Sequence, residues 1–337
     1  MSITLFLSSL LTLVSLNCEN LFDCRHDSLK NDYEWLPEGT NRWTQTRYWH
    51  KLNNIGREIL ACGEQWGDFS SENTRKSTKK SEKSTWKLPD LVALSEIEND
   101  SVLRDLTKRS LLRNARYEYV ATNSPDVRGI DVALLYSPFT FRLLNHHAIR
   151  VKPLKDMRQT RDILYASGQV VSGDTLHIFV VHAPSRSGGE AVTQPYRLQV
   201  AERLCEAVDS VFQRHKAAKI LVAGDFNDYA DNKSIHRIEK GGLTDISRHA
   251  TGRNGATATY RFQGEWGSLD HIFASEAMTA CLTECYVFDA PFLLEDDETY
   301  GGVKPRRNYN GQRYMNGFSD HLPLVARFRF NDKPEKT

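Results

Sequence analysis

The sequence predicts a mixed α/β fold, because short apolar runs recur along the chain and stretches of helical periodicity fall between some of them. Most of these runs are rich in valine, isoleucine, leucine and phenylalanine, which is typical of strands that are covered on both faces. The clearest helical stretch, residues 195–215, carries one apolar stripe at helical spacing. Of the 337 residues, 40% are hydrophobic and 26% are charged, as in a soluble globular protein.

Eight apolar runs are predicted to be strands. They are, in chain order, residues 11–17, 88–97, 117–122, 130–137, 176–183, 219–227, 268–275 and 322–330. Helices are predicted over residues 48–63, 101–114 and 195–215, and Pro195 suits the first turn of the last helix, where no N–H is needed. The apolar stripe of this last helix comprises Leu198, Ala201, Leu204, Cys205, Val208, Val211 and Phe212, and Arg197 is placed off it.

The whole chain, residues 1–337, is predicted to form one domain, since no repeat and no linker-like composition divides it. Residues 70–85 are polar and basic and contain no aliphatic side chain, so we expect a mobile loop there. This loop is either a solvated insertion or a salt-sensitive arm that contacts nucleic-acid phosphates.

The N-terminal 17 residues are apolar and contain no lysine or arginine, the first basic residue being Arg25. The run is short for a membrane span and lacks the basic start of a signal peptide, so we favour a buried first strand. We expect no integral membrane segment and favour a cytoplasmic location, with export left open. The net charge of +1 gives no general attraction to nucleic acid or membranes, and the oligomeric state stays open.

Polar side chains stand at the ends of six predicted strands. Four strands release such groups at their C-terminal tips: Asn17, Glu96, His182, and Asp225 with Asn227. Two strands carry them at their beginnings: Asp270, and Asp320 with His321. If the last two strands run antiparallel to the first four, all of these groups meet at one rim.

The residue types at this rim indicate a particular chemistry. Asparagine, glutamate and aspartate oxygens without thiolates suit a hard cation, Mg²⁺ or Mn²⁺, better than zinc. A hard cation beside two histidines and a carboxylate-paired base is suited to the hydrolysis of phosphate esters by water. The pattern therefore predicts a metal-assisted phosphoryl-transfer site.

Seven motifs carry a resemblance to a known family. SLNCENLF, LSEIEN, GIDVALLYS, VVHAPSRSGG, VAGDFND, GSLDHIF and SDHLPL, in this order, closely resemble the endonuclease/exonuclease/phosphatase superfamily over about residues 11–330. The resemblance implies an α/β fold of four layers, an α/β/β/α sandwich of two mainly antiparallel sheets flanked by helices. It also implies a Mg²⁺-dependent enzyme, with Mn²⁺ as an alternative ion.

The resemblance further implies the role of each site residue. Asn17, Glu96 and Asp320 match the metal-binding set.

The catalytic set follows from the same resemblance. Asp225 matches the aspartate that orients or activates the attacking water, and Asn227 the amide that steadies the phosphate. His321 with Asp270 matches a histidine–aspartate pair, and His182 a second histidine that faces the scissile phosphate. Whether His321 acts as a base or as an electrostatic clamp stays open at this point.

We expect a phosphodiesterase that hydrolyses P–O bonds by in-line attack of water, with nucleic acid as the favoured phosphate-ester partner and an endonuclease as the favoured enzyme. The alternatives are a phosphomonoesterase, a sphingomyelinase-like lipid phosphodiesterase, or a non-catalytic binding module on the same fold. SLDHIF stands where inositol polyphosphate 5-phosphatases carry a Cys-Asp-Arg-Ile type of motif, which counts against that branch. His182 stands where apurinic-site endonucleases have tyrosine, which favours the deoxyribonuclease- or sphingomyelinase-like side.

Some segments near the motifs have two interpretations. Arg128, Arg161 and Arg186 can grip phosphate oxygens or form surface salt bridges. Residues 304–314, rich in tyrosine and arginine, are either a substrate lip or a folded-back loop capped by tyrosines. Glu19 touches the metal, supports the site from behind, or is merely solvated.

Overall fold

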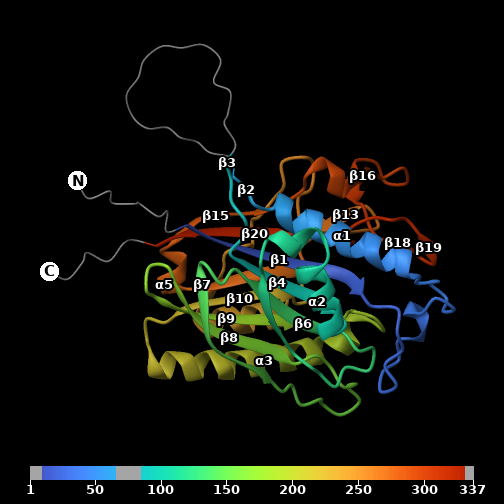
Figure 1. The fold of residues 1–337 in the computed structure, drawn as a ribbon. Helices are drawn as coiled ribbons and strands as arrows, with labels where there is room; N and C mark the ends of the chain where they lie inside the picture. Colours follow the sequence, from blue (N-terminus) through green and yellow to red (C-terminus); the bar gives the residue numbers. More distant parts are fainter. Residues whose placement is uncertain (1–9, 66–84, 331–337) are drawn as a thin grey trace, which may run out of the picture.

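The computed structural model describes residues 10–65 and 85–330 and contains two six-stranded sheets that pack face to face (Figure 1). The first sheet has the order β15-β20-β1-β4-β6-β5 and the second β11-β14-β10-β9-β8-β7. In the first sheet the strands are β1 (Leu10–Leu21), β4 (Leu91–Ile97), β5 (Glu118–Ala121), β6 (Asp131–Tyr136), β15 (Leu282–Val287) and β20 (Leu324–Arg329). In the second they are β7 (Phe141–Ile149), β8 (Ile163–Val170), β9 (Thr175–His182), β10 (Lys219–Asp225), β11 (Leu243–Asp245) and β14 (Asp270–Ser275).

Both sheets are mainly antiparallel, as the resemblance implied. Within the described strands, β1 pairs in parallel with β4, and β10 pairs in parallel with β9, while the other neighbours in the two sheets are antiparallel. In particular, β20 runs antiparallel to β1, and β14 runs antiparallel to β10. The beginnings of β14 and β20 therefore lie at the same rim as the C-terminal ends of β1, β4, β9 and β10.

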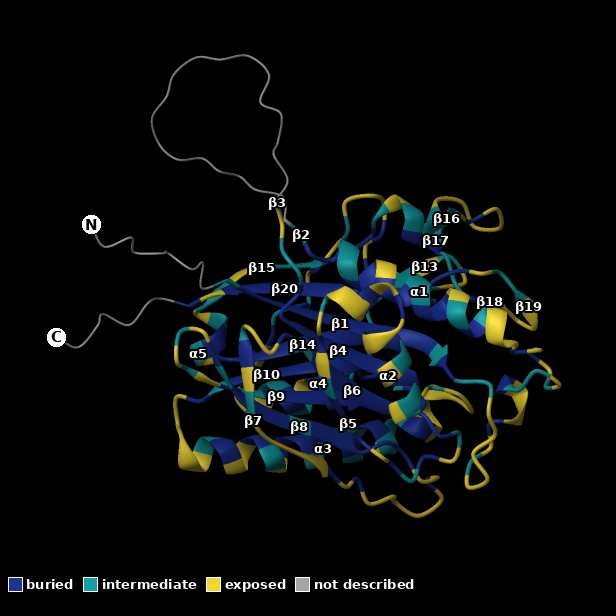
Figure 2. Ribbon diagram, in the orientation of Figure 1, coloured by how far each residue is buried: buried dark blue, intermediate teal, exposed yellow. Residues whose placement is uncertain are grey.

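Helices cover the outer face of each sheet and complete four layers. On the first sheet lie α1 (Gln45–Ala61) and α2 (Asp100–Lys108), whose buried faces join the core between the sheets. On the second lie α3 (Glu190–Arg214) and α4 (Lys233–Lys240), which enclose a separate apolar cluster. Figure 2 shows the central strands of both sheets dark blue, while yellow exposed residues concentrate on the helices and connecting loops.

The apolar composition of the central strands follows from this layering. In β10, Leu221 and Ala223 face the other sheet, whereas Ile220 and Val222 face α3 and α4. A strand that is buried on both faces has no solvent-facing position, so it reads as a continuous apolar run.

Short elements connect the layers. They are the hairpins β2 (Glu64–Gln65) with β3 (Thr85–Trp86), β12 (Tyr260–Phe262) with β13 (Glu265–Gly267), β16 (Leu294–Asp296) with β17 (Val303–Pro305) and β18 (Tyr309–Asn310) with β19 (Arg313–Tyr314). A short helix α5 (Glu276–Thr279) and 3-10 turns at Tyr33–Trp35, Leu111–Asn114 and Pro291–Leu293 complete the list. The loop expected at residues 70–85 lies, apart from Thr85, outside the described residues.

All eight predicted strands are present, and the first begins at Leu10. The sequence reading missed β7, β8, β11 and β15. The outer strand β7 exposes a run of mostly polar residues that includes His146 and His147, so it has no continuous apolar run to recognise.

Two expectations for α3 were wrong. The helix begins after Gly189, so Pro195 lies inside it rather than in its first turn. Arg197 is not off the buried stripe but almost fully buried, because its Nε contacts the buried carboxylate of Asp228 at 2.6 Å. A buried arginine is tolerated only with such a partner, which a helical pattern cannot show.

Two further expectations concern membrane-spanning helices and the organisation of the chain into domains. No helix in residues 10–65 and 85–330 is both long and apolar enough to cross a membrane. The organisation of residues 1–337 as one domain stays a prediction.

Candidate active site

The candidate active site lies where the tips of central strands from both sheets meet. In the second sheet, Asp225 at the end of β10 lies opposite His182 of β9 and opposite Asp270 of β14. From the first sheet, Asn17 of β1 donates a hydrogen bond from Nδ2 to Asp225 Oδ2 at 2.9 Å. The fold therefore brings Asn17 into contact with a residue that lies 208 positions further along the chain.

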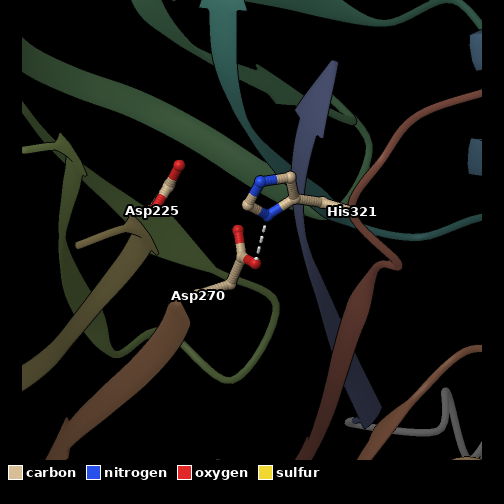
Figure 3. A group of neighbouring side chains, drawn as sticks. All are labelled: Asp225, Asp270 and His321. Carbon is tan, nitrogen blue, oxygen red and sulfur yellow. Dashed lines mark hydrogen bonds and ion pairs between the residues drawn. The ribbon is translucent and has the colours of Figure 1, made fainter. Parts of the chain in front are cut away.

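A histidine–aspartate pair forms one side of the site (Figure 3). His321 Nδ1 lies 2.7 Å from Asp270 Oδ2, and the Thr259 hydroxyl donates to the same oxygen at 2.7 Å. The imidazole stacks on the ring of Tyr260, with the centroids 4.9 Å apart. Burial by itself lowers the pKa of His321, but the Asp270 carboxylate raises that pKa well above its usual value. His321 is thus held as an imidazolium by its partner.

Asp225 occupies the centre of the arrangement. Its Oδ1 accepts the backbone N–H of Asn227 at 2.8 Å, and its Oδ2 accepts the Asn227 side-chain amide at 3.3 Å. Burial raises the pKa of Asp225 to about 7, with His321 opposing the rise and Asp270 adding to it. A carboxylate so placed can exchange a proton near neutral pH.

The turn after β10 needs two unusual residues. A Cβ at Gly224 would collide with the Val181 backbone, so only glycine fits there. Asn227 has a φ of +51°, which asparagine tolerates better than most residues. Its amide donates to Ala183 O at 3.1 Å as well as to Asp225, so its donors are already used in fixing the turn.

Both parallel strands of the first sheet become irregular at the site. The register shifts after Asn17 in β1, and again between Ser95 and Ile97 in β4. Glu96 has a φ of +62°, and its Oε2 accepts the backbone N–H of Asn20 at 2.8 Å. Its Oε1 lies 3.7 Å from His182 Nε2. Bulges of this kind turn a side chain away from the regular strand direction and toward a site.

Asp320 lies beside Arg307, which was not among the predicted metal-binding or catalytic residues. Its Oδ2 accepts a hydrogen bond from Arg307 Nη2 at 3.0 Å, and Arg307 Nε lies 3.6 Å from Glu19 Oε1. In the sequence Arg307 stands out only as one of the basic residues of segment 304–314, and no motif indicates its contact with Asp320.

Glu19 ties the segment of Arg307 to the first sheet. Its carboxylate accepts the backbone N–H of Asn308 at 2.6 Å and that of Tyr309 at 3.2 Å. Tyr309 is buried and packs edge-on against Trp35 at 5.6 Å between centroids. This part of residues 304–314 therefore matches the folded-back alternative and not the substrate lip, and Glu19 supports the site from behind.

His182 is buried between carboxylates on one side and arginines on the other. Its Nε2 lies 3.7 Å from Asp225 Oδ2, and its Nδ1 has no hydrogen-bond partner among the described residues. Burial lowers the pKa of His182 well below its usual value, and Arg161 and Arg128 lower it further. The imidazole is therefore neutral, in contrast to His321.

The structure gives different surroundings to the three arginines near the motifs, Arg128, Arg161 and Arg186. Arg161 forms a buried ion pair with Asp126 at 3.1 Å, and Arg186 forms an ion pair with Glu190. Arg128 is half-buried and contacts no carboxylate in the described part of the chain. The surface salt-bridge interpretation thus fits Arg186, whereas the ion pair of Arg161 is buried.

The residues present fit a divalent cation. Ligand atoms of Asp225, Asp270 and His321 lie within 4.8 Å of one another, but Asp270 and His321 already bind each other through one of these atoms. Asp270 Oδ1 is buried without a partner among the described residues. Burial also raises the pKa of Glu19 to about 7, with Asp320 as the next cause. Several buried carboxylates close together repel one another, and a nearby cation stabilises them.

Comparison with known proteins agrees with the fold. A family model described as "Endonuclease/Exonuclease/phosphatase family" matches residues 12–329. A search of curated proteins found no match.

Three solved structures illustrate the likeness. An endonuclease/exonuclease/phosphatase family protein from Bacteroides thetaiotaomicron is 16% identical, with a TM-score of 0.61, over 97% of this chain and 100% of that one. A mannosyl-6-phosphatase from the same species is 16% identical, with a TM-score of 0.59, over 95% and 100%. The human Nocturnin catalytic domain with a bound sulfate anion is 18% identical, with a TM-score of 0.54, over 96% of both chains. At these identities the likeness shows the shared fold.

Proposed function

The chain belongs to the endonuclease/exonuclease/phosphatase family, and from this membership we propose that it is a Mg²⁺-dependent phosphodiesterase, and specifically a nuclease. One observation carries the proposal: Asp225, anchored by Asn17 from the facing sheet, stands next to the His321–Asp270 pair. A carboxylate beside an imidazolium offers a proton acceptor and a positive charge within one small site.

The chain's own residues divide the work in this proposal. Asp225 accepts a proton from the attacking water. His321, kept charged by Asp270, turns its Nε2 toward the phosphate and balances the negative charge that develops there. Asn227 holds the Asp225 carboxylate in place, because its donors are already used within the turn. His182, which is neutral, stands on the other side of Asp225 and orients the phosphate without adding charge.

Asn17, Glu96 and Asp320 are the proposed ligands of the cation. Mg²⁺, or Mn²⁺ in its place, would neutralise charge on the phosphate oxygens and so favour the attack of water on the phosphorus. Arg307 contacts Asp320 and so limits the positions that the Asp320 carboxylate can take. Glu19 keeps the Arg307 segment attached to β1.

Hydrolysis of bis-p-nitrophenyl phosphate, with Mg²⁺ and with EDTA, tests the diesterase. We expect turnover that requires the cation and that falls by about 10²–10⁴-fold in Asp225→Asn. Asp209→Asn, at an exposed position on α3, is the matched control and should keep full activity. Full activity of the Asp225 variant would rule out the proposed role of this residue.

A phosphomonoesterase is the second candidate, and the likeness to the mannosyl-6-phosphatase favours it. Turnover of p-nitrophenyl phosphate in preference to the diester would select it. A panel of plasmid DNA, single-stranded DNA, RNA, sphingomyelin and inositol phosphates then identifies the substrate class. No hydrolysis of any phosphate ester, together with no cation binding, would instead indicate a binding module.

A further inference from the structure

A cavity of about 560 Å³ lies beside the candidate active site. Its walls come from residues 126–128, from residues 156–161 before β8, and from residues 184–188 after β9. Arg161 connects the cavity to the site, because its Nη2 donates to Ala183 O at 2.6 Å. The same carbonyl oxygen accepts the Asn227 amide at 3.1 Å. The cavity and the catalytic turn therefore share one backbone group.

Positive charge without a protein partner lines this cavity. Arg128 and Arg158 both contribute to the wall, and in the described ranges neither side chain forms an ion pair or hydrogen bond. The carboxylate of Asp126 cannot serve them, since it already accepts the Arg128 backbone N–H at 3.0 Å and Arg161 Nη1 at 3.1 Å. The remaining acid in the wall is the exposed Asp156.

Buried donors in the same wall also lack partners. The Thr160 hydroxyl belongs to a side chain that is 3% exposed, and Arg161 Nε to one that is 6% exposed. Neither atom has a hydrogen-bond partner among the described residues. Leaving such groups unpaired is costly. Both atoms are shielded from the cavity, so they mark a polar wall behind its surface and are not contact points for a ligand.

The combination points to the chemical class of the ligand. The volume lies within the range of small-molecule pockets. Guanidinium groups bind phosphate oxygens in a bidentate manner. The two guanidinium groups of Arg128 and Arg161 also act electrostatically on His182, which shows that the cavity wall lies close to the reacting centre.

We propose that this cavity is a second phosphate subsite, which binds a phosphate group that the substrate carries in addition to the ester under attack. The proposal rests on the proposed function, because it assumes a phosphate ester in the neighbouring site. Arg128 and Arg158 supply the charge that binds this phosphate. The second phosphate comes either from an adjacent nucleotide or from a bisphosphorylated sugar.

Paired substrates that differ only in the second phosphate test this subsite. One arm compares thymidine 5′-(p-nitrophenyl phosphate) with and without a 3′-phosphate, and the other compares glucose 1,6-bisphosphate with glucose 6-phosphate. We expect kcat/KM to be about tenfold or more higher for the doubly phosphorylated member of one arm, and which arm responds identifies the source.

Arg158→Gln should remove most of this preference. Arg142→Gln is the matched control, because Arg142 is exposed and pairs with Gln169 at the opposite end of the β7–β8 pair. Equal behaviour of the two variants, or no preference in either arm, would overturn the subsite even if the diester is cleaved.

Direct binding separates this proposal from the proposed function. Calorimetric titration with pyrophosphate should show binding that is weakened about fivefold or more in Arg128→Gln and Arg158→Gln but not in Arg142→Gln. If no ester is hydrolysed, this result alone decides: selective weakening supports the anion site, and unchanged or undetectable binding overturns it.

Discussion

Two histidine–aspartate pairs with almost the same contact distance each take one member from β14, and we propose different roles for them. The dipeptide Asp-His occurs at positions 270–271 and 320–321. Asp270 lies 2.7 Å from His321 Nδ1, whereas His271 Nδ1 lies 2.8 Å from Asp245 Oδ2. All four side chains are buried, and both histidines have a raised pKa. Residue type, contact distance and burial therefore do not distinguish a reactive pair from a structural one.

The second ring nitrogen makes the difference. His271 Nε2 lies 2.9 Å from Asp228 O, so both of its nitrogens have protein partners. His321 Nε2 has no hydrogen bond to any described residue. Asp270 and His271 are neighbours on β14 and point to opposite faces of the sheet, the first toward the rim and the second toward Phe226 and Phe273. A histidine is available to a substrate only where the fold leaves one nitrogen free.

The largest expected effect is on turnover, and its absence would show that His321 and His271 do not differ in function. His321→Gln should lower the turnover of bis-p-nitrophenyl phosphate about 10²–10⁴-fold, because it removes the charged donor that faces the phosphate. His271→Gln is the matched variant and should retain near wild-type turnover per folded molecule while lowering the unfolding temperature. Similar loss of turnover in both variants, at equal folded fractions, would show that the two pairs are not functionally distinct.

A second prediction concerns the buried groups that support the His271–Asp245 pair. Asp228, whose carbonyl contacts His271, is held through its carboxylate by Arg197 at 2.6 Å and by the Ser234 hydroxyl at 2.6 Å. Arg197→Met leaves this buried carboxylate with less compensation, so the free energy of unfolding should fall by about 3–5 kcal/mol. Urea denaturation measures it. Arg203→Met, which breaks an exposed pair on the same helix, should cost about 1 kcal/mol or less, and equal losses would contradict the network.

A third prediction concerns pH. Burial by itself lowers the pKa of His271, but the hydrogen bond to Asp245 raises it above its usual value. A group whose pKa is raised on folding stabilises the protein fully below its unfolded pKa, about 6.5 for histidine, and loses this contribution as the pH rises through the folded value. His271→Gln should therefore lower the free energy of unfolding by about 1–3 kcal/mol at pH 5.5 and by less at pH 9.

The control for this pH dependence is His146→Gln, at an exposed position of β7. It should change the free energy of unfolding by less than about 0.5 kcal/mol at both pH values. A difference between wild type and the His271 variant that grows with rising pH would contradict a stabilising His271–Asp245 ion pair.

Much of the fold followed from local patterns in the sequence. Strands such as β9 and β10 are buried on both faces, so their apolar runs are visible without any knowledge of the partner strand. Glu96 and Asp225 stand out as polar residues at the ends of the apolar runs of β4 and β10, and Asn17 stands out where β1 loses its regular register. Edge strand β7 and buried Arg197 were misjudged for the converse reason: their surroundings are set by distant segments.

The participation of Arg307 and the cavity next to Arg161 also depended on distant segments. Arg307 reaches Asp320 and Glu19 because Glu19 binds the backbone of residues 308 and 309, nearly 300 residues further along the chain. The cavity is formed by three loops together with Asn31 and the first turns of α3, and none of the loops has a periodic pattern. Contacts between loops leave no regular spacing in a sequence.

The sequence by itself determined which side chains stand at the ends of buried strands, because the run of apolar residues and its polar tip are both local properties. Only the tertiary structure decided that Asp270 joins His321 while His271 turns to Asp245. That choice depends on how two sheets pack and on which face of β14 each residue occupies, and the same Asp-His dipeptide allows either outcome.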